Sequence, residues 1–328
     1  MGDISMKHLR YFEALAQHGH FGRAAVACAI SQPALSLQIK ELEEILGAPL
    51  VERGPRQIRL TGLGESFAAR AREILRAVDE LDDLARASHS PLAGRLRIGV
   101  IPTVAPYLLP TVMKRLTDRH PELDLRPREA VTQRLVEDLL EGRLDAALVA
   151  LPVSEPALAE YPLFDEEFIL VRPREDAGRP VPNPEILREM RLLLLEEGHC
   201  FREQALSFCR MSSSLPRDLM EGSSLTTLVQ MVGAGIGVTL IPQMALPIET
   251  RSSAVSVARL PQPRPTRTIG MVWRKTNPLS ASFQHIAEIV REVGLEALGD
   301  IVSGAGLDWK PDDAPAGEIA PARRLSAG

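Results

Sequence analysis

Cysteine is scarce in this chain, which has three, Cys28, Cys200 and Cys209, among 328 residues. So few cysteines exclude the disulfide-dense scaffold of a secreted protein and are typical of a reducing cytosol. Long apolar runs are absent as well, since no stretch approaches the roughly 18 residues that a membrane-spanning helix requires. The first twelve residues lack the basic and then apolar pattern of a secretion leader. We therefore expect a soluble cytoplasmic protein with no membrane partner.

An excess of basic charge is also missing, because 38 Lys and Arg stand against 43 Asp and Glu, for a formal net charge of −5. This balance excludes a uniformly basic surface, although a local basic patch can still bind nucleic acid. Charged residues make up 25% of the chain and hydrophobic residues 45%, which excludes wholesale disorder. The length suffices for two or three domains, each with its own core.

The first 66 residues have the pattern of short helices followed by a small hairpin. Apolar residues from Leu35 to Leu46 recur at spacings of four, three and four, which predicts a helix with one apolar face. Ser31 can cap this helix and Gly47 can end it. The pattern predicts a helix-turn-helix whose second helix reads base edges, with a hairpin wing on the phosphates. The residues that we expect to contact DNA are Ser31, Gln32, Pro33, Ser36, Gln38, Lys40, Arg53, Arg56 and Arg59.

Charge alone leaves a second interpretation of this region open, a helical bundle with a solvated basic turn. Residues 1–66 hold seven Lys and Arg against seven Asp and Glu.

Residues 67–90 predict a long linker helix, because apolar residues from Phe67 to Ala85 alternate spacings of four and three. Such a narrow seam favours dimerisation, and the alternative is a helix that packs on its own domain.

From residue 95 onward, strands and helices alternate, which predicts an α/β domain with a largely parallel sheet. Thr103, Thr132 and Cys200 each stand where a strand gives way to a helix. Ligands bind at such junctions in open α/β sheets, where helix N-termini offer free N–H groups and positive potential. A cysteine at such a place is expected to have a lowered thiol pKa. His199 beside it can assist by charge or by a hydrogen bond, and the two hydroxyls can hold a small polar molecule.

Cys209 lies nine residues beyond Cys200. If the segment between them is helical, their Cα atoms are about 13 Å apart along the axis and on opposite faces. A disulfide tolerates at most about 7 Å between Cα atoms, so the two thiols can bond only if residues 201–208 unwind. Oxidation would then select a second backbone arrangement. The alternative is that Cys209 is an ordinary core residue, as we expect for Cys28.

Short motifs run through the N-terminal region. They are Leu9-Arg10-Tyr11-Phe12, Phe21-Gly22-Arg23-Ala24-Ala25, Ser31-Gln32-Pro33-Ala34-Leu35-Ser36, Leu42-Glu43, residues 50–53, Leu60-Thr61 and Gly64. This set resembles the DNA-binding domain of LysR-type transcriptional regulators. The resemblance implies homodimers, often paired into homotetramers, that bind double-stranded promoter DNA. It also implies an effector domain like a periplasmic binding protein, with two α/β subdomains.

The implied boundaries follow the same family. They are a winged helix-turn-helix at 1–66, a linker (dimerisation) helix at 67–90 and an effector domain at 95–302. Within the effector domain, subdomain I covers about 95–165 and 268–302, and subdomain II about 166–267. Residues 304–328 are dominated by Gly, Ala, Pro and charge, which predicts a disordered tail.

A second set of motifs lies in the effector region. They are residues 99–103, 106–110 and 129–132, Glu197-Gly198-His199-Cys200, Gln204-Ala205, Cys209, and Arg267-Thr268-Ile269-Gly270. This set is similar to the peroxide-sensing branch of the LysR type. The resemblance implies that Cys200 is the peroxidatic cysteine and Cys209 the resolving one. It also implies a peroxide pocket lined by Thr103, Thr132, His199 and Arg267.

On this interpretation, hydrogen peroxide oxidises Cys200 to a sulfenic acid, which condenses with Cys209 to a disulfide. A thiol reductant of the glutaredoxin or thioredoxin type resets the sensor. We expect an activator of antioxidant genes rather than an enzyme, with RNA polymerase as a further partner and with no cofactor or metal. Two alternatives stay open. One is a LysR-type regulator that binds a small organic anion non-covalently, and the other is a thiol peroxidase, in which the N-terminal ninety residues would have no purpose.

Overall fold

The computed structural model describes residues 3–53, 58–89, 92, 94–209, 220–251 and 253–304. The chain divides into two compact units. The first comprises Met1–Asp165, Glu196–Gln204 and Arg267–Val293, and the second Glu166–Leu195, Ala205–Thr266 and Gly294–Gly328. Arg56 of the expected hairpin and nearly all of the predicted tail lie outside the described residues. So do residues 211–219, which we expect to refold on oxidation.

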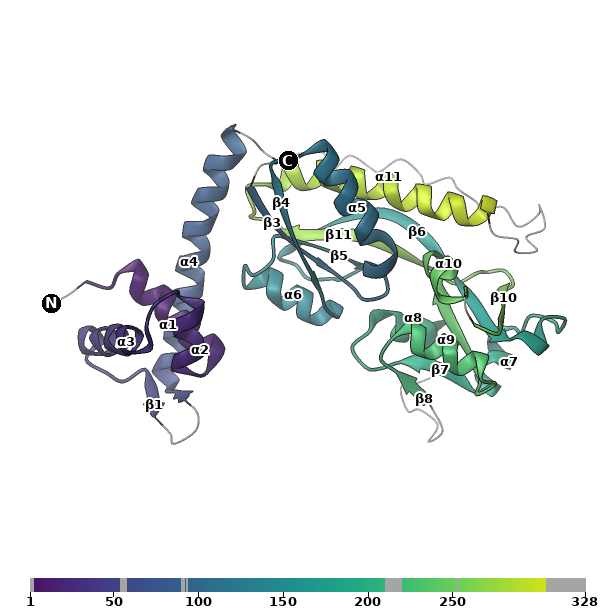
Figure 1. Ribbon diagram of the computed structural model, residues 1–328, viewed down its shortest axis with the longest axis horizontal. Coiled ribbons are helices and arrows are strands. Elements are labelled where there is room, and N and C mark those ends of the chain that lie inside the picture. Colours follow the sequence, from purple (N-terminus) through teal and green to yellow (C-terminus); the bar gives the residue numbers. More distant parts are fainter. Residues whose placement is uncertain are drawn as a thin grey trace. The chain divides into compact units, whose positions relative to one another are not determined.

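Three short helices and a two-stranded hairpin begin the first unit (Figure 1). They are α1 (Met6–His18), α2 (Phe21–Ala27), α3 (Gln32–Leu46), β1 (Val51–Arg53) and β2 (Ile58–Leu60). Ser31 caps α3 by accepting the Ala34 N–H, and Gly47 ends the helix with a φ of 69°, as the sequence predicted. Leu35, Ile39 and Leu42 are fully buried in the core that these helices share, so the predicted helix-turn-helix fold is confirmed.

The linker helix α4 (Gly62–His89) starts inside this same core. The ring of Phe67 meets that of Phe12 edge-on, with 5.4 Å between centroids, and Ala71 is buried. The alternative interpretation of the seam, packing on its own domain, therefore holds for its first turns. Farther along, Ile74 and Leu81 are 47% and 63% exposed, so this part of the seam presents apolar side chains to solvent.

The first unit continues as an α/β layer. Strand β3 (Gly94–Val100) pairs in parallel with β4 (Leu123–Glu129) and with β5 (Ala146–Leu151), and β11 (Thr266–Arg274) pairs antiparallel to β5. Figure 1 shows α5 (Ala105–Arg119) and α11 (Ser280–Gly304) on one side of this sheet and α6 (Thr132–Leu140) on the other. The carboxyl ends of β3 and β4 thus lead into α5 and α6, the junctions that the sequence singled out.

The second unit is a second α/β layer. Its strands are β6 (Leu158–Pro173) from Glu166 onward, β7 (Leu192–Leu195), β8 (Met220–Gly222), β9 (Val238–Pro242) and β10 (Val255–Arg259). Its helices are α7 (Pro184–Glu189), α9 (Leu225–Gly233), α10 (Leu246–Glu249) and the later parts of α8 (Cys200–Phe208) and α11. The predicted class, a winged helix-turn-helix with a two-part α/β effector domain, is confirmed.

The expectation of a largely parallel sheet is wrong. Strand β7 runs parallel to β8 and β9, but β6 pairs antiparallel with both β9 and β10. The sequence pattern missed β6 because Pro162 and three consecutive acids, Asp165 to Glu167, interrupt its apolar run. Two of these acids are buried and paired: Glu166 accepts the Met244 N–H at 3.2 Å, and Glu167 accepts from Arg259 at 2.7 Å. None of the helices in the described part of the chain is long and apolar enough to span a bilayer.

Candidate functional site

A buried arginine is anchored at the first of the three junctions. Arg267, near the start of β11, is 3% exposed, and Thr103, in the turn between β3 and α5, is 2% exposed. The arginine donates from Nη1 to Thr103 Oγ1 at 2.7 Å and from Nη2 to the Thr103 carbonyl at 3.0 Å. Its guanidinium also lies 5.2 Å from the centroid of the Phe201 ring, a cation–π contact. Because Phe201 directly follows Cys200, this contact holds a positive charge at the start of α8.

The second junction brings Thr132 to the same neighbourhood. Thr132 is the first residue of α6, and its Oγ1 is buried with no hydrogen-bond partner in the described part of the chain. Gly198 has a φ of 93°, and a Cβ there would contact the Val131 side chain at 3.8 Å. The turn before α8 therefore lies against the start of α6. Its left-handed backbone favours glycine, the residue that the sequence supplies.

His199 stands in this turn, next to Cys200. Burial lowers the pKa of His199, and the nearby carboxylates of Glu196 and Glu129 offset this shift in part. The lowered pKa favours the neutral imidazole, which can donate or accept a hydrogen bond. The influence of Glu129, the last residue of β4, also places His199 near the end of that strand.

The third junction is the start of α8. The helix begins at Cys200, which is half-buried, and ends at Phe208. The Cys209 N–H still donates to the Ala205 carbonyl at 3.1 Å, so the backbone between the two cysteines is helical, as expected. Cys209 is 1% exposed, and burial raises the pKa of its thiol to about 11. Helical spacing keeps the Cα atoms of the two cysteines about 13 Å apart.

Sequence reasoning gave no role to two residues of α8. Phe201 supplies the ring under the Arg267 guanidinium, and Gln204 has a buried Oε1 with no hydrogen-bond partner among the described residues. Gln204 lies four residues after Cys200, so both side chains point to one face of the helix. The four-residue spacing was the signal that would have selected it.

Cys28 differs from both other cysteines. It packs against the helix-turn-helix core but is half-buried, so the expectation of a core residue holds in part. Burial raises the pKa of its thiol, and the carboxylate of Glu13 adds to the shift. Cys28 is therefore a poor nucleophile at neutral pH.

The expected DNA-reading face of α3 needs one correction. Ser31, Gln32, Pro33 and Lys40 are exposed, whereas Ser36 and Gln38 are only half-exposed. At about 100° per residue, the face opposite the buried side chains carries Leu37 rather than Gln38. Leu37 is 64% exposed and was missed because apolar residues were assigned to the core. In the same helix Gln38 donates to Glu41 at 2.8 Å, and Lys40 pairs with Glu44 at 3.3 Å.

The hairpin is fastened to α3 by a carboxylate. Glu43 Oε1 accepts the N–H groups of Leu50 and Val51 at 2.7 and 3.1 Å, which fixes the angle of the wing. Gly64 sits against the same strand, because a Cβ there would overlap the Leu50 carbonyl oxygen. Arg59 is exposed on β2, opposite Glu52 in the ladder. The side chains of Arg53 and Arg56 lie outside the described residues.

Comparison with known proteins agrees with this arrangement. Residues 6–65 match the family described as bacterial regulatory helix-turn-helix protein, lysR family, and residues 89–294 match the LysR substrate binding domain. A "Probable hydrogen peroxide-inducible genes activator" of Streptomyces viridosporus is 45% identical over 88% of this chain and 94% of its own length. The "DNA-binding transcriptional dual regulator OxyR" of Escherichia coli K12 is 40% identical over 88% of this chain and 95% of its own length.

Solved structures give the same result. A full-length OxyR from Pseudomonas aeruginosa, with aspartate in place of one cysteine, aligns with a TM-score of 0.72 and 35% identity over 89% of this chain and 96% of its own. A cysteine-to-serine mutant of Corynebacterium glutamicum OxyR, described as H2O2-bound, aligns with a TM-score of 0.64 and 34% identity over 92% and 96%.

The helix-turn-helix, the linker helix and the two-part α/β domain thus define a LysR-type transcriptional regulator. The two family matches together cover residues 6–65 and 89–294 of the chain. Within the LysR family, the chain belongs to the OxyR group of hydrogen-peroxide-inducible gene activators.

Proposed function

We propose that this chain senses hydrogen peroxide through Cys200 and Cys209 and converts their oxidation into a change in DNA binding. The observation that carries the proposal is the convergence at the start of α8. A buried arginine bonded to Thr103 flanks the turn that presents Cys200. The buried Thr132 hydroxyl, which has no hydrogen-bond partner among the described residues, flanks it as well. Hydroxyl and guanidinium donors suit a molecule as small and polar as hydrogen peroxide.

In the first step the Cys200 thiolate attacks one peroxide oxygen, and the O–O bond breaks. A sulfenic acid forms on the sulfur, and the hydroxide that leaves takes up a proton to become water. The negative charge that develops on this oxygen is stabilised by nearby donors, the role that we assign to the Arg267 guanidinium and the Thr103 and Thr132 hydroxyls. His199, whose lowered pKa favours the neutral imidazole, can donate or accept one further hydrogen bond.

In the second step the Cys209 thiol attacks the sulfenic sulfur of Cys200. The S–S bond forms as the S–O bond breaks, and the thiol proton leaves with the hydroxyl group as a second water. Two thiols thus lose two electrons while one peroxide becomes two waters. Because helical spacing keeps the two Cα atoms about 13 Å apart, α8 must unwind before this step. A cytosolic dithiol of the glutaredoxin or thioredoxin class would return the pair to thiols.

The DNA-binding part of the proposal rests on α3 and the linker helix. The exposed residues of α3, among them Gln32, Pro33 and Lys40, would face the major groove of promoter DNA. The exposed Ile74 and Leu81 of α4 would pair with the same helix of a second copy, giving a dimer that reads two half-sites. Pairing of dimers into tetramers and contact with RNA polymerase stay predictions from the family resemblance.

A thiol titration tests the sensing step. The reduced protein has three thiols, and one equivalent of peroxide should leave one. Cys200→Ser should keep both of its thiols under the same treatment. Cys209→Ser should lose the Cys200 thiol to a sulfenic acid that a dimedone-type reagent traps. Cys28→Ser is the matched control and should keep the full response.

Other results would contradict the proposal. Two unreacted thiols in the wild-type protein would favour a regulator that binds an organic anion without covalent chemistry. Turnover that continues beyond one equivalent when a reductant is supplied would favour a thiol peroxidase. Loss of the response in Cys28→Ser would show that the wrong cysteine was dismissed.

A further inference from the structure

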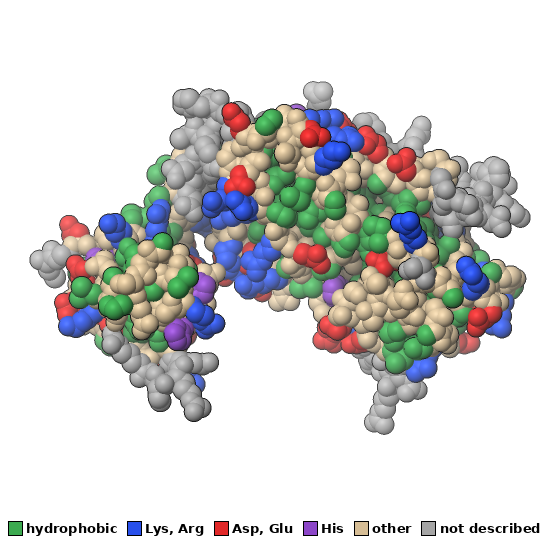
Figure 2. Space-filling model, in the orientation of Figure 1, with side chains coloured by type: hydrophobic (Ala, Val, Ile, Leu, Met, Phe, Trp, Pro, Cys, Tyr) green, Lys and Arg blue, Asp and Glu red, His purple; other side chains and the backbone are tan. Residues whose placement is uncertain are grey.

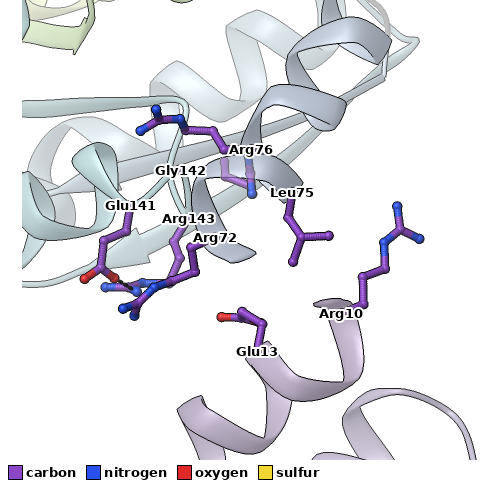
Figure 3. A pocket seen from close by; sticks show the side chains of 9 residues that line it. Arg10, Glu13, Arg72, Leu75, Arg76, Glu141, Gly142 and Arg143 are labelled. Carbon is purple, nitrogen blue, oxygen red and sulfur yellow. Dashed lines mark ion pairs between the residues drawn. The ribbon is translucent and has the colours of Figure 1, made fainter. Parts of the chain in front are cut away.

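A cavity of about 230 Å³ lies in the first unit, and none of the proposed peroxide-site residues lines it. Its walls come from α1 of the helix-turn-helix, from the linker helix α4, from β3 and from the turn after α6 (Figure 3). Five of the lining side chains are arginines: Arg10, Arg72, Arg76, Arg97 and Arg143. In Figure 2 blue Lys and Arg side chains gather on the face of the first unit shown there.

Three of these arginines are held in place by contacts outside the cavity. Arg97 forms a two-pronged ion pair with Asp145, the shorter contact being 2.6 Å, and Arg143 pairs with the buried Asp138 at 2.6 Å. Arg76 donates from Nη1 to the Leu140 carbonyl at 3.1 Å. Their guanidinium planes are therefore fixed before any ligand arrives, which reduces the entropy cost of binding.

The remaining two arginines, Arg10 and Arg72, have no ion pair or hydrogen bond with any other described residue. Among the described lining residues the carboxylates are Glu13 and Glu141, and Glu141 already pairs with Arg143. Arg97 and Arg143 are further balanced by Asp145 and Asp138, which lie outside the lining. Burial raises the pKa of Glu13, and the charges of Arg72 and Arg143 reduce this effect in part. The cavity thus has a positive excess, concentrated on Arg10 and Arg72.

We propose that this cavity binds a compact oxyanion with two or more negative charges, held chiefly by Arg10 and Arg72. Guanidinium groups match the paired oxygens of phosphates and carboxylates, and such charge-assisted bonds are strong. A volume of about 230 Å³ is below the roughly 300–1,000 Å³ of sites for drug-sized ligands, which favours a small anion. The side chain of Leu75 faces the same space and adds an apolar wall (Figure 3).

Such an anion would join three parts of the first unit. Arg10 belongs to the helix-turn-helix and Arg72 to the linker helix, while Arg97 and Arg143 belong to the α/β layer. Binding would tie the DNA-binding helices to the α/β layer of the first unit. The proposal is independent of the peroxide chemistry, because its test reads anion binding directly in the reduced protein.

Titration calorimetry of the full-length reduced protein tests this site at constant ionic strength. The probes are inorganic phosphate, pyrophosphate and citrate, which separate a phosphate source from a carboxylate source. We expect saturable binding of at least one of them. Arg10→Ala and Arg72→Ala should each weaken it by about tenfold or more, and the double variant should abolish it. Arg72→Lys, which keeps the charge but loses the fork, should fall between Arg72→Ala and the wild type.

Arg70→Ala is the matched control, because Arg70 lies on the same helix, is 78% exposed and pairs with Glu73 outside the cavity. It should bind the anion as the wild type does. No saturable heat with any of the three probes would overturn the proposal, and so would equal weakening by Arg70→Ala and Arg72→Ala. If circular dichroism shows that Arg72→Ala does not fold, the anion affinity of Arg10→Ala, a substitution at an exposed residue, tests the proposal by itself.

Discussion

Cys209 gives the sharpest test of how the fold controls reactivity. In a Cys28→Ser/Cys200→Ser variant it is the only thiol, and in the folded protein burial raises its pKa from 9.0 to about 11. At neutral pH this difference lowers the thiolate fraction by about a hundredfold, which corresponds to about 3 kcal/mol. Since the thiolate is the reactive form, we expect alkylation of the folded variant to be at least about a hundredfold slower than in denaturant.

The same shift predicts a loss of stability at alkaline pH. The folded protein binds the Cys209 proton more tightly than the unfolded chain does, so this contribution to the free energy of unfolding is complete below about pH 9. It is lost as the pH rises through about 11. Between pH 8 and pH 11 the free energy of unfolding measured with denaturant should drop by about 2 kcal/mol. Cys209→Ala, which keeps a small buried side chain, should lack this drop.

One result would refute this reasoning. A pH–rate profile for alkylation of the folded variant with a midpoint near 9, together with equal rates in buffer and in denaturant, would mean that α8 does not shield Cys209. Shielding has a direct consequence for the proposed mechanism, because a buried, protonated thiol cannot attack a sulfenic acid. The resolving step would then follow the opening of α8 and could not precede it.

Four substitutions extend the test to other parts of the molecule. Thr103→Val removes the hydroxyl that accepts a hydrogen bond from a buried guanidinium, so the free energy of unfolding in chemical denaturation should fall by about 1–3 kcal/mol. Oxidation by peroxide, followed by stopped flow, should also become slower. Thr103→Ser should restore both properties. Gly64→Ala places a Cβ against a strand carbonyl and should lower the melting temperature, whereas Gly62→Ala, with open space around it, should not. Arg56→Ala should weaken DNA binding for all sequences and reduce the salt slope by about 1. Leu37→Ala should instead change which bases the protein prefers. Replacing one thymine of the site by uracil, which deletes only a methyl group, should weaken binding of the wild type but not of Leu37→Ala. A uniform loss of affinity in Leu37→Ala would contradict base contact.

Local signals in the sequence were enough for the DNA-binding part. Three short-range patterns predicted helix α3, and the structure contains all of them. They are the apolar spacing from Leu35 to Leu46, the N-cap at Ser31 and the C-terminal glycine Gly47. Strand β6 is different, because its two buried acids are balanced by Met244 and Arg259, partners far away in the chain. No local pattern contains those partners, so the segment resembled a loop.

The residues of the candidate site show the same difference between short-range and long-range signals. Thr103, Thr132 and Cys200 were found from the residues alone, since each stands at a strand-to-helix junction. Arg267 contacts Thr103 across 164 sequence positions and came only from the family resemblance. Phe201 is core-like by pattern, and its position beside the guanidinium depends on β11, which follows it by more than sixty residues. Tertiary contacts between distant segments therefore account for what the sequence pattern missed.

Helix α8 has a further property that bears on the proposed switch. Its first turn, through Gln204, belongs to the first unit, and the residues from Ala205 belong to the second. Cys200 and Cys209 therefore stand on opposite sides of a unit boundary that a single helix crosses. The proposed disulfide requires this helix to unwind, because its ends are about 13 Å apart along the axis. The chain also passes between the units within β6, β11 and α11, so α8 is the one of these crossings that the proposed disulfide would alter.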